Sequence, residues 1–372
     1  MVIGLKGLTS IGRESFFVSL AMGYFTSMLS DFDQANSVLR PHFPHVAQWF
    51  GCRIESVSGG FSGAGVFKVE TAKARYCLRR WPVGHTSAIR VLAIHELLAL
   101  AKDHGVATVS VPLKSGSGTT LPEVNAAFWQ LEPWMSGVAD FLAAPNEERL
   151  KSAMTQLARF HNAVGDWVPS VGAGQWFQPG NIKACPTITN RIRMIDSYAS
   201  SIADLEAALA RESDARFRDA GVRVALLFRS AHLDVQRELA VVEGLPVPLQ
   251  PCIRDLWHDH LLFQGDELSG IVDFGAMATD SVCCDLSRLL GSLFGDDSAS
   301  WQRGIGYYEV VRTLTESEHR LLRPLDRSSV LLSGMTWLKR RYVLRNTPAD
   351  LSRVCDRLDA ILVRLSSLAL DS

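Results

Sequence analysis

The chain has 372 residues, of which 47% are hydrophobic and 21% charged, and its formal net charge is −1. This composition is typical of a globular protein, and the length favours two lobes or domains over one compact core. The near-zero charge excludes a general electrostatic attraction to nucleic acid, because no dense Lys and Arg run compensates for it.

The amino-terminal segment carries a short apolar run over residues 16–29. A membrane-spanning helix needs about 20 apolar residues, so this run is too short. It also lacks a clear small-residue cleavage site, which argues against a signal peptide. Residues 1–40 are therefore interpreted as an extension, helical or partly disordered, and Met28 is a plausible alternative start.

Residues 41–133 are expected to form a small antiparallel sheet. Alternating patterns predict three strands over residues 52–58, 66–69 and 75–79, and a glycine-rich loop joins the first two. Apolar residues at helical spacing predict a helix over residues 87–103. Two more strands are expected over residues 108–113 and 126–131, and Pro133 should end the sheet because proline cannot extend an interior strand.

Residues 134–372 are expected to be mainly helical. Residues 172–186 read as a loop, and residues 245–249 read as a proline-containing link. Two short strands, over residues 261–264 and 270–272, are joined by a turn at Gly265 and Asp266. Helices are predicted over residues 147–164, 188–209 and 215–242, with several more from about residue 284 onward. Strands gathered in one part and helices in the other indicate an α+β fold.

Seven cysteines occur in the chain without a Cys-x-x-Cys pair. This spacing argues against a disulfide scaffold and against a cysteine zinc site. Reduced thiols in a cytoplasmic protein fit better.

Two acidic residues, Asp255 and Asp273, flank the predicted hairpin. Because paired strands bring their outer ends together, both carboxylates can occupy one small volume. Phosphoryl transfer requires one carboxylate that accepts the proton of the attacking hydroxyl and another that holds Mg²⁺ against the phosphate oxygens. A second interpretation takes His258, Asp259 and His260 with Asp273 as a transition-metal hydrolase site, which leaves the glycine loop without a role.

The segment from Ile253 to Gly275 resembles the aminoglycoside phosphotransferase and choline kinase group, which has a protein-kinase-like, two-lobed fold. The resemblance implies that Asp255 is the catalytic residue, that Asp273 binds metal, and that His260 stands where the group has a metal-binding Asn. It extends over residues 50–345 and implies ATP, Mg²⁺ and a small-molecule substrate, with Mn²⁺ as an alternative ion. The implied nucleotide-binding residues are Gly60, Ser62, Gly63, Arg79 and Glu96, with Glu96 as the ion-pair partner of Arg79.

Three residues depart from the pattern of the group: Ile253 replaces a His, Arg254 a Gly and His260 an Asn. Imidazole is a poor Mg²⁺ ligand, which leaves four alternatives: Asp259 supplies an oxygen instead, the second metal binds weakly, a softer ion such as Mn²⁺ is tolerated, or activity has been lost. A catalytically silent nucleotide-binding module is therefore the alternative function. His161, on an apolar helix face, is interpreted as a core histidine, and Asp285 as a structural residue that caps a helix or bonds the catalytic loop.

Overall fold

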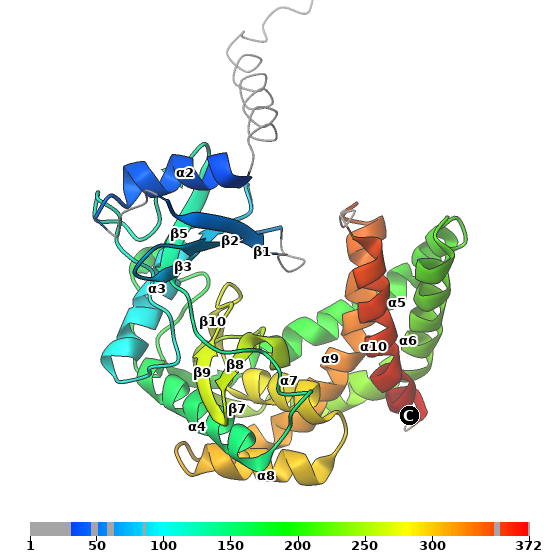
Figure 1. Ribbon diagram of the computed structural model, residues 1–372. Helices are drawn as coiled ribbons and strands as arrows, with labels where there is room; N and C mark the ends of the chain where they lie inside the picture. Colours follow the sequence, from blue (N-terminus) through cyan, green and yellow to red (C-terminus); the bar gives the residue numbers. More distant parts are fainter. Residues whose placement is uncertain (1–30, 46–50, 58–62, 85–86, 346–349, 371–372) are drawn as a thin grey trace, which may run out of the picture. The chain divides into compact units, whose positions relative to one another are not determined.

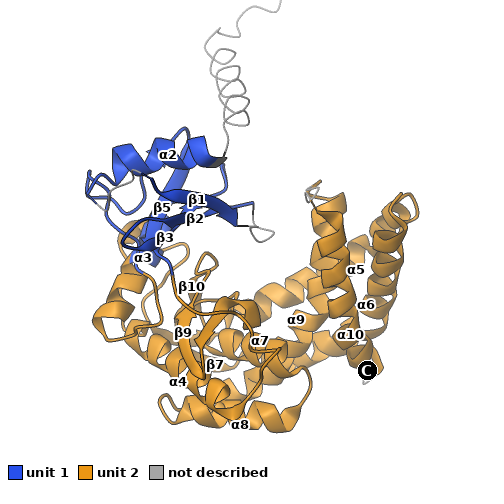
Figure 2. Ribbon diagram, in the orientation of Figure 1, with its two compact units in different colours: residues 1–95, 111–134 blue, residues 96–110, 135–372 orange. Residues whose placement is uncertain are grey.

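The computed structural model describes residues 31–45, 51–57, 63–84, 87–345 and 350–370. The chain forms two compact units (Figures 1 and 2), unit 1 with residues 1–95 and 111–134, and unit 2 with residues 96–110 and 135–372. Within the described ranges, no helix combines the length and apolar character that a membrane span requires. The apolar run over residues 16–29 lies outside these ranges.

Unit 1 contains a five-stranded antiparallel sheet with the order β1-β2-β3-β5-β4. The expected strands are confirmed at four places, and β5 ends at Pro133 as expected. The strands are β1 (Arg53–Val57), β2 (Gly65–Glu70), β3 (Arg75–Arg80), β4 (Glu123–Val124) and β5 (Ala127–Pro133).

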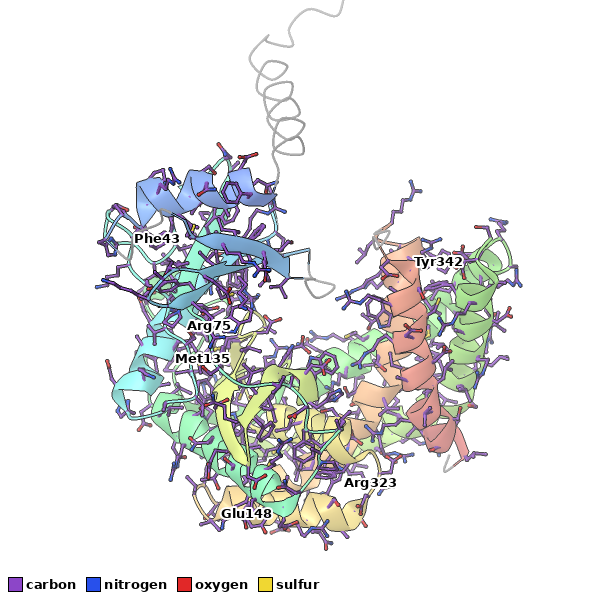
Figure 3. All side chains as sticks on the ribbon, viewed as in Figure 1. Phe43, Arg75, Met135, Glu148, Arg323 and Tyr342 are labelled. Carbon is purple, nitrogen blue, oxygen red and sulfur yellow. The ribbon has the colours of Figure 1, made fainter. Side chains whose placement is uncertain are left out.

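Helix α2 (Asp31–His42) covers this sheet and contributes to the core of unit 1. Val38, Leu39 and the following Phe43, which Figure 3 labels, are fully buried against Phe67 and neighbouring apolar residues. The part of the expected extension that the structure describes is therefore an integral layer of unit 1.

The strand expected over residues 108–113 does not form. The carbonyl of Thr108 accepts a bond from Ile271, whereas Leu113 donates to Leu131. The two ends of the segment thus bond to different strands, and Pro112 between them lacks a donor, so no continuous ladder develops. Helix α3 (Ala88–Asp103) precedes this segment and confirms the predicted helix.

Unit 2 is mainly helical, as expected. The predicted bounds of α4 and α6 agree with the structure, and each begins at a side chain, Asn146 or Asp214, that accepts a backbone N–H bond. The long helices α6, α9 and α10 pack against one another. The helices are α4 (Glu147–Val164), α5 (Pro186–Leu209), α6 (Ala215–Val242), α7 (Cys283–Phe294), α8 (Ser298–Glu309), α9 (Glu316–Tyr342) and α10 (Leu351–Leu370).

The expected hairpin forms from β8 (Leu261–Gln264), which has the predicted bounds, and β9 (Glu267–Ile271), which begins three residues before the predicted strand over residues 270–272. The prediction of a mere link over residues 245–249 and a loop over residues 172–186 was wrong. Strand β7 (Pro246–Cys252) pairs through its first half with β6 (Asn181–Ala184) and through its second half with β10 (Ala278–Asp280). Since each half of β7 is paired along one edge by these strands, its prolines are tolerated.

Candidate active site

The catalytic loop runs from the end of β7 to the short 3₁₀ helix η2 (His258–His260). Ile253 is fully buried and anchors the start of the loop in the core of unit 2. Arg254 has a φ of 68°, a left-handed backbone conformation that glycine adopts without strain. This conformation gives the physical reason why glycine suits the position, and it costs Arg254 on the order of 1–3 kcal/mol.

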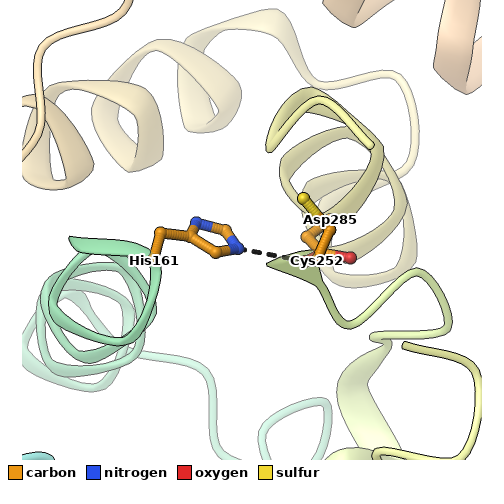
Figure 4. A group of neighbouring side chains, drawn as sticks. All are labelled: His161, Cys252 and Asp285. Atoms are coloured by element: carbon orange, nitrogen blue, oxygen red, sulfur yellow. Dashed lines mark hydrogen bonds and ion pairs between the residues drawn. The ribbon is translucent and has the colours of Figure 1, made fainter. Parts of the chain in front are cut away.

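Buried Asp285, in the first turn of α7, fixes this loop through two backbone bonds. Its Oδ2 accepts the N–H of Ile253 at 2.8 Å, and its Oδ1 accepts the N–H of Arg254 at 2.5 Å. His161 of α4 donates from Nε2 to Oδ2 at 3.0 Å, the contact drawn in Figure 4. Of the two structural roles expected for Asp285, it takes the one of bonding the catalytic loop.

His161 is the core histidine that the sequence predicted. It is fully buried, and its Nδ1 accepts a hydrogen bond from the Tyr308 hydroxyl at 2.8 Å. Burial lowers the pKa of His161 below its ordinary value, although Asp285 opposes the shift. The ring is therefore neutral at pH 7, with the proton on Nε2, and both ring nitrogens are satisfied.

His260 connects Asp255 to Asp273. Its Nδ1 lies 2.8 Å from the backbone carbonyl oxygen of Asp255, and its Nε2 lies 3.9 Å from Oδ2 of Asp273. The side chains of Asp255 and Asp273 are 48% and 39% exposed, so both carboxylates are open to a ligand. Asp273, like Arg254, has a positive φ, of 65°.

The hydrogen bonds of His260 define its tautomer. Nδ1–H donates to the carbonyl of Asp255, and Nε2 accepts the indole N–H of Trp257 at 2.9 Å. Burial lowers the pKa of the ring, which keeps it neutral. Neither nitrogen retains a lone pair for a metal, so the metal-ligand role expected of His260 requires the Trp257 bond to break.

Mg²⁺ nevertheless fits the donor set at this place. The ion prefers oxygen ligands, keeps several waters, and is commonly held by one or two carboxylates together with substrate phosphates. Asp273 offers such an oxygen at the end of the hairpin. Asp259 is exposed and lies 3.4 Å from His258.

The side chain of Arg254 forms an ion pair with a buried residue of unit 2. Its Nε lies 3.2 Å from Oδ2 of buried Asp280, which also accepts the Thr187 hydroxyl at 2.6 Å. This ion pair and the backbone bond to Asp285 hold the strained loop residue in place. The guanidinium is thus committed to the structure of the loop.

Two buried groups of side chains have metal-ligating atoms within 4.8 Å of one another: His161 with Cys252 and Asp285, and Cys185 with Asp280 and Cys284. In the first, His161 donates to Asp285, the bond drawn in Figure 4, and accepts from Tyr308. In the second, Cys185 donates to Asp280.

Both groups of side chains are hydrogen-bonded parts of the core. Burial raises the pKa of the Cys252 thiol, and a bond to Cys185 together with burial raises that of Cys284. These thiols therefore stay protonated. Among the described residues, no such group contains His258, Asp259 or His260, and the hydrolase interpretation gains no support.

The nucleotide-binding residues expected in unit 1 are only partly described. Gly60 and Ser62 lie outside the described residues, and Gly63 has a φ of 78° in the connection between β1 and β2. On β3, Arg80 bonds Gln34 of α2, so Arg79 lies on the opposite face of the sheet, since neighbouring strand residues alternate. Glu96 is exposed and belongs to unit 2, so its pairing with Arg79 stays a prediction.

Three residues near Asp255 were not singled out from the sequence. Arg288 of α7 donates from Nη2 to Oδ1 of Asp255 at 2.5 Å. Trp257 bonds His260, and the guanidinium of Arg357 of α10 lies 4.3 Å from the centre of the Trp257 ring. Arg288 could have been found, because it lies one helical turn after Asp285; nothing in the sequence marks Arg357.

The fold and this loop define a phosphotransferase of the protein-kinase-like class. The chain belongs to the phosphotransferase enzyme family, whose family model matches residues 53–319.

Similar curated sequences are homoserine kinases. The protein of Rhizobium rhizogenes is 36% identical over 100 residues, which is 26% of this chain and 30% of that protein. The protein of Chelativorans is 31% identical over 140 residues, 36% of this chain and 38% of that protein. The chain thus spans about a third of the length of the curated relatives it matches.

Solved structures share the fold at low sequence identity. An aminopropanol kinase associated with a microcompartment has a TM-score of 0.61 at 13% identity, covering 91% of this chain and 96% of its own. An amicoumacin kinase, solved with AMP-PNP, Ca²⁺ and its substrate, has a TM-score of 0.60 at 13% identity, covering 92% and 94%. These likenesses confirm the expected α+β, protein-kinase-like fold.

Proposed function

We propose that this protein is an ATP-dependent phosphotransferase that moves the γ-phosphoryl group of ATP to a hydroxyl of a small molecule. The observation that carries the proposal is the arrangement of Asp255 and Asp273 on either side of His260, at the two ends of a hairpin. Membership of the phosphotransferase enzyme family supports the same reaction.

Each acidic residue has a distinct role in this proposal. One oxygen of Asp255 is held by Arg288, and the other is available to accept the proton of the acceptor hydroxyl. The bond from that hydroxyl oxygen to the γ-phosphorus forms while the bond to the bridging oxygen of ADP breaks. Asp273 would hold Mg²⁺, which neutralises the charge of the phosphate oxygens when bound.

Other residues position these groups. Neutral His260 fixes the backbone of Asp255 by its Nδ1–H bond, and Asp285 fixes the two preceding N–H groups. We keep Gly60, Ser62 and Gly63 as the proposed nucleotide loop and Arg79 as the proposed phosphate contact. A cytoplasmic location completes the proposal, supported by seven free cysteines.

The acceptor belongs to the proposal as well. The homoserine kinases among the relatives make L-homoserine the first candidate, and the small-molecule kinases that share the fold suggest amino alcohols and aminoglycosides as comparisons. A panel of these compounds should be screened for ATP consumption in the presence of Mg²⁺ or Mn²⁺.

The decisive variant is Asp255→Asn. Because the amide cannot accept a proton, kcat should fall roughly 100- to 10,000-fold while ATP binding and the thermal midpoint change little. Asp204→Asn, an exposed residue on α5, is the control and should behave like the wild type. ATP binding without turnover on any acceptor would instead indicate the silent nucleotide-binding module.

A further inference from the structure

Arg288 places a partly unused guanidinium beside the proposed catalytic base. Its Nη2 donates to Asp255, and its Nε is buried without a hydrogen-bond partner among the described residues. Burying a donor without a partner is costly, so such groups usually mark a ligand, a water or an ion. Within the described ranges, Arg288 therefore carries an unsatisfied buried donor on the same guanidinium that bonds Asp255.

Arg357 brings a second guanidinium to the same neighbourhood from α10. It is half-buried and stacks on Trp257 at 4.3 Å, a favourable cation–π contact. In the described part of the chain, no carboxylate lies within ion-pair distance of it. Burial and then the charge of Arg288 lower the pKa of Arg357, and the carboxylates of Asp259 and Asp255 oppose that shift.

Trp257 makes this arrangement rigid. Its indole N–H donates to Nε2 of His260, and His260 in turn bonds the carbonyl of Asp255. The ring on which Arg357 rests is therefore tied to the same loop as the catalytic base. A guanidinium that is already stacked on a fixed aromatic ring loses little side-chain entropy when it binds a planar anion.

The charged groups around Asp255 do not suit a polycationic acceptor. Asp255 is already bonded by Arg288, and Asp259 is half exposed beside His258. Two repelling arginines, one with an unpaired donor and one without an acidic partner, call for an anion between or beside them. Guanidinium groups bind carboxylate and phosphate oxygens through paired hydrogen bonds.

We propose that Arg288 and Arg357 form an anion-binding site for the acceptor, so that the substrate is a hydroxyl compound carrying a carboxylate. This inference rests on the proposed function and narrows its acceptor class. The oxyanion could also come from the nucleotide. Because Arg288 contacts Asp255, the group that faces the acceptor hydroxyl, the acceptor is the source we assign.

The test compares Arg357→Gln with the wild type on two matched pairs: L-homoserine with its carboxamide, and D-glycerate with glycerol. Losing one charged hydrogen-bond partner should raise KM for the carboxylate that the wild type uses roughly 10- to 100-fold, with KM for ATP unchanged. The partner that lacks the carboxylate should be a poor substrate for both proteins. Arg357→Lys keeps the charge and should recover part of the loss.

Arg353→Gln is the matched control, because Arg353 is exposed one turn earlier on α10. It should leave both KM values unchanged. An increase in KM for ATP alone in Arg357→Gln would assign the site to the nucleotide and overturn the proposal. Equal use by the wild type of the acid and of its partner without a carboxylate would also overturn it.

Calorimetric titration with L-homoserine and D-glycerate, without ATP, separates this inference from the proposed function. Binding of either acid that Arg357→Gln abolishes and Arg353→Gln retains would support the anion site even if no acceptor were phosphorylated. Phosphorylation of neutral or cationic acceptors, with neither acid bound, would support the kinase and refute the anion site.

Discussion

Two histidines contribute to the fold and not to the proposed chemistry, because they are buried and fully hydrogen-bonded. His161 and His95 are both buried, both have two hydrogen-bonded ring nitrogens, and burial lowers the pKa of both. Neither reaches a ligand in the proposed mechanism. Their contribution is to the fold, His161 behind the catalytic loop and His95 within unit 1.

His95 predicts a pH dependence of stability. Its Nε2–H donates to Gln130 and its Nδ1 accepts from Thr120, and burial lowers its pKa to about 4. Between the unfolded value of about 6.5 and this folded value, the unfolded state binds the extra proton, so stability falls as the pH falls. The contribution over this window is roughly 3 kcal/mol.

Urea unfolding of the wild type and His95→Gln at several pH values measures this contribution. The variant should be less stable at pH 7, and the difference in the free energy of unfolding should shrink by roughly 3 kcal/mol as the pH approaches 4. His104→Gln, an exposed residue just after α3, should follow the wild type. A difference independent of pH would show that His95 does not titrate in this way.

Helix α7 organises the catalytic loop from outside it. Asp285 in its first turn bonds the loop backbone, and Arg288 one turn later bonds the side chain of Asp255. The helix is itself almost entirely buried. One element therefore fixes both the backbone path and the carboxylate orientation of the proposed base.

Asp285→Asn tests this role of α7. The amide nitrogen replaces an acceptor with a donor that faces backbone N–H groups, so the free energy of unfolding should drop by about 3 kcal/mol, and kcat should fall more than KM for ATP rises. Chemical denaturation and steady-state kinetics measure both. Asp297→Asn is the control, since asparagine also caps the start of α8. Unchanged kinetics in Asp285→Asn would contradict the positioning role.

The elements that the sequence predicted are those with local signals. Amphipathic periodicity indicated α4 and α6 with their observed bounds, and turn residues indicated the hairpin of β8 and β9. Strands β6 and β7 were missed because their pairing is non-local and β7 contains three prolines. Residues 108–113 had a strand-like pattern, but their two ends bond to different strands.

The residues of the candidate site also divide into those that a local motif reveals and those that only tertiary packing brings together. Asp255, Asp273 and His260 lie within one short segment, so a motif could bring them together from the sequence. Arg357 comes from α10, about a hundred positions later, and only tertiary packing brings it to Trp257. Similarly, the tautomer of His260 follows from Trp257 and the Asp255 carbonyl, two partners that the sequence alone does not reveal.

At the scale of the whole molecule, the proposed ligands divide between the two units. Arg79 and Gly63 belong to unit 1, whereas Asp255, Asp273 and Arg288 belong to unit 2. Unit 2 offers Mg²⁺ one well-placed carboxylate, Asp273, since both nitrogens of His260 are bonded. The remaining ligands of the ion must then be phosphate oxygens and waters.

This donor set predicts that Mg²⁺ and nucleotide stabilise the protein together and not separately. Mg²⁺ alone should leave the thermal midpoint unchanged, whereas AMP-PNP with Mg²⁺ should raise it. With the ligand at about 100 times its Kd, the free energy of unfolding should increase by about 2.7 kcal/mol. Asp273→Asn should lose most of this increment yet keep its fold, because asparagine tolerates the positive φ of the position. Asp266→Asn, in the exposed turn of the same hairpin, should keep the increment. If Mg²⁺ alone stabilised the wild type as strongly as the pair, a preformed protein cage for the metal would have to exist, and a single carboxylate at Asp273 could not provide it.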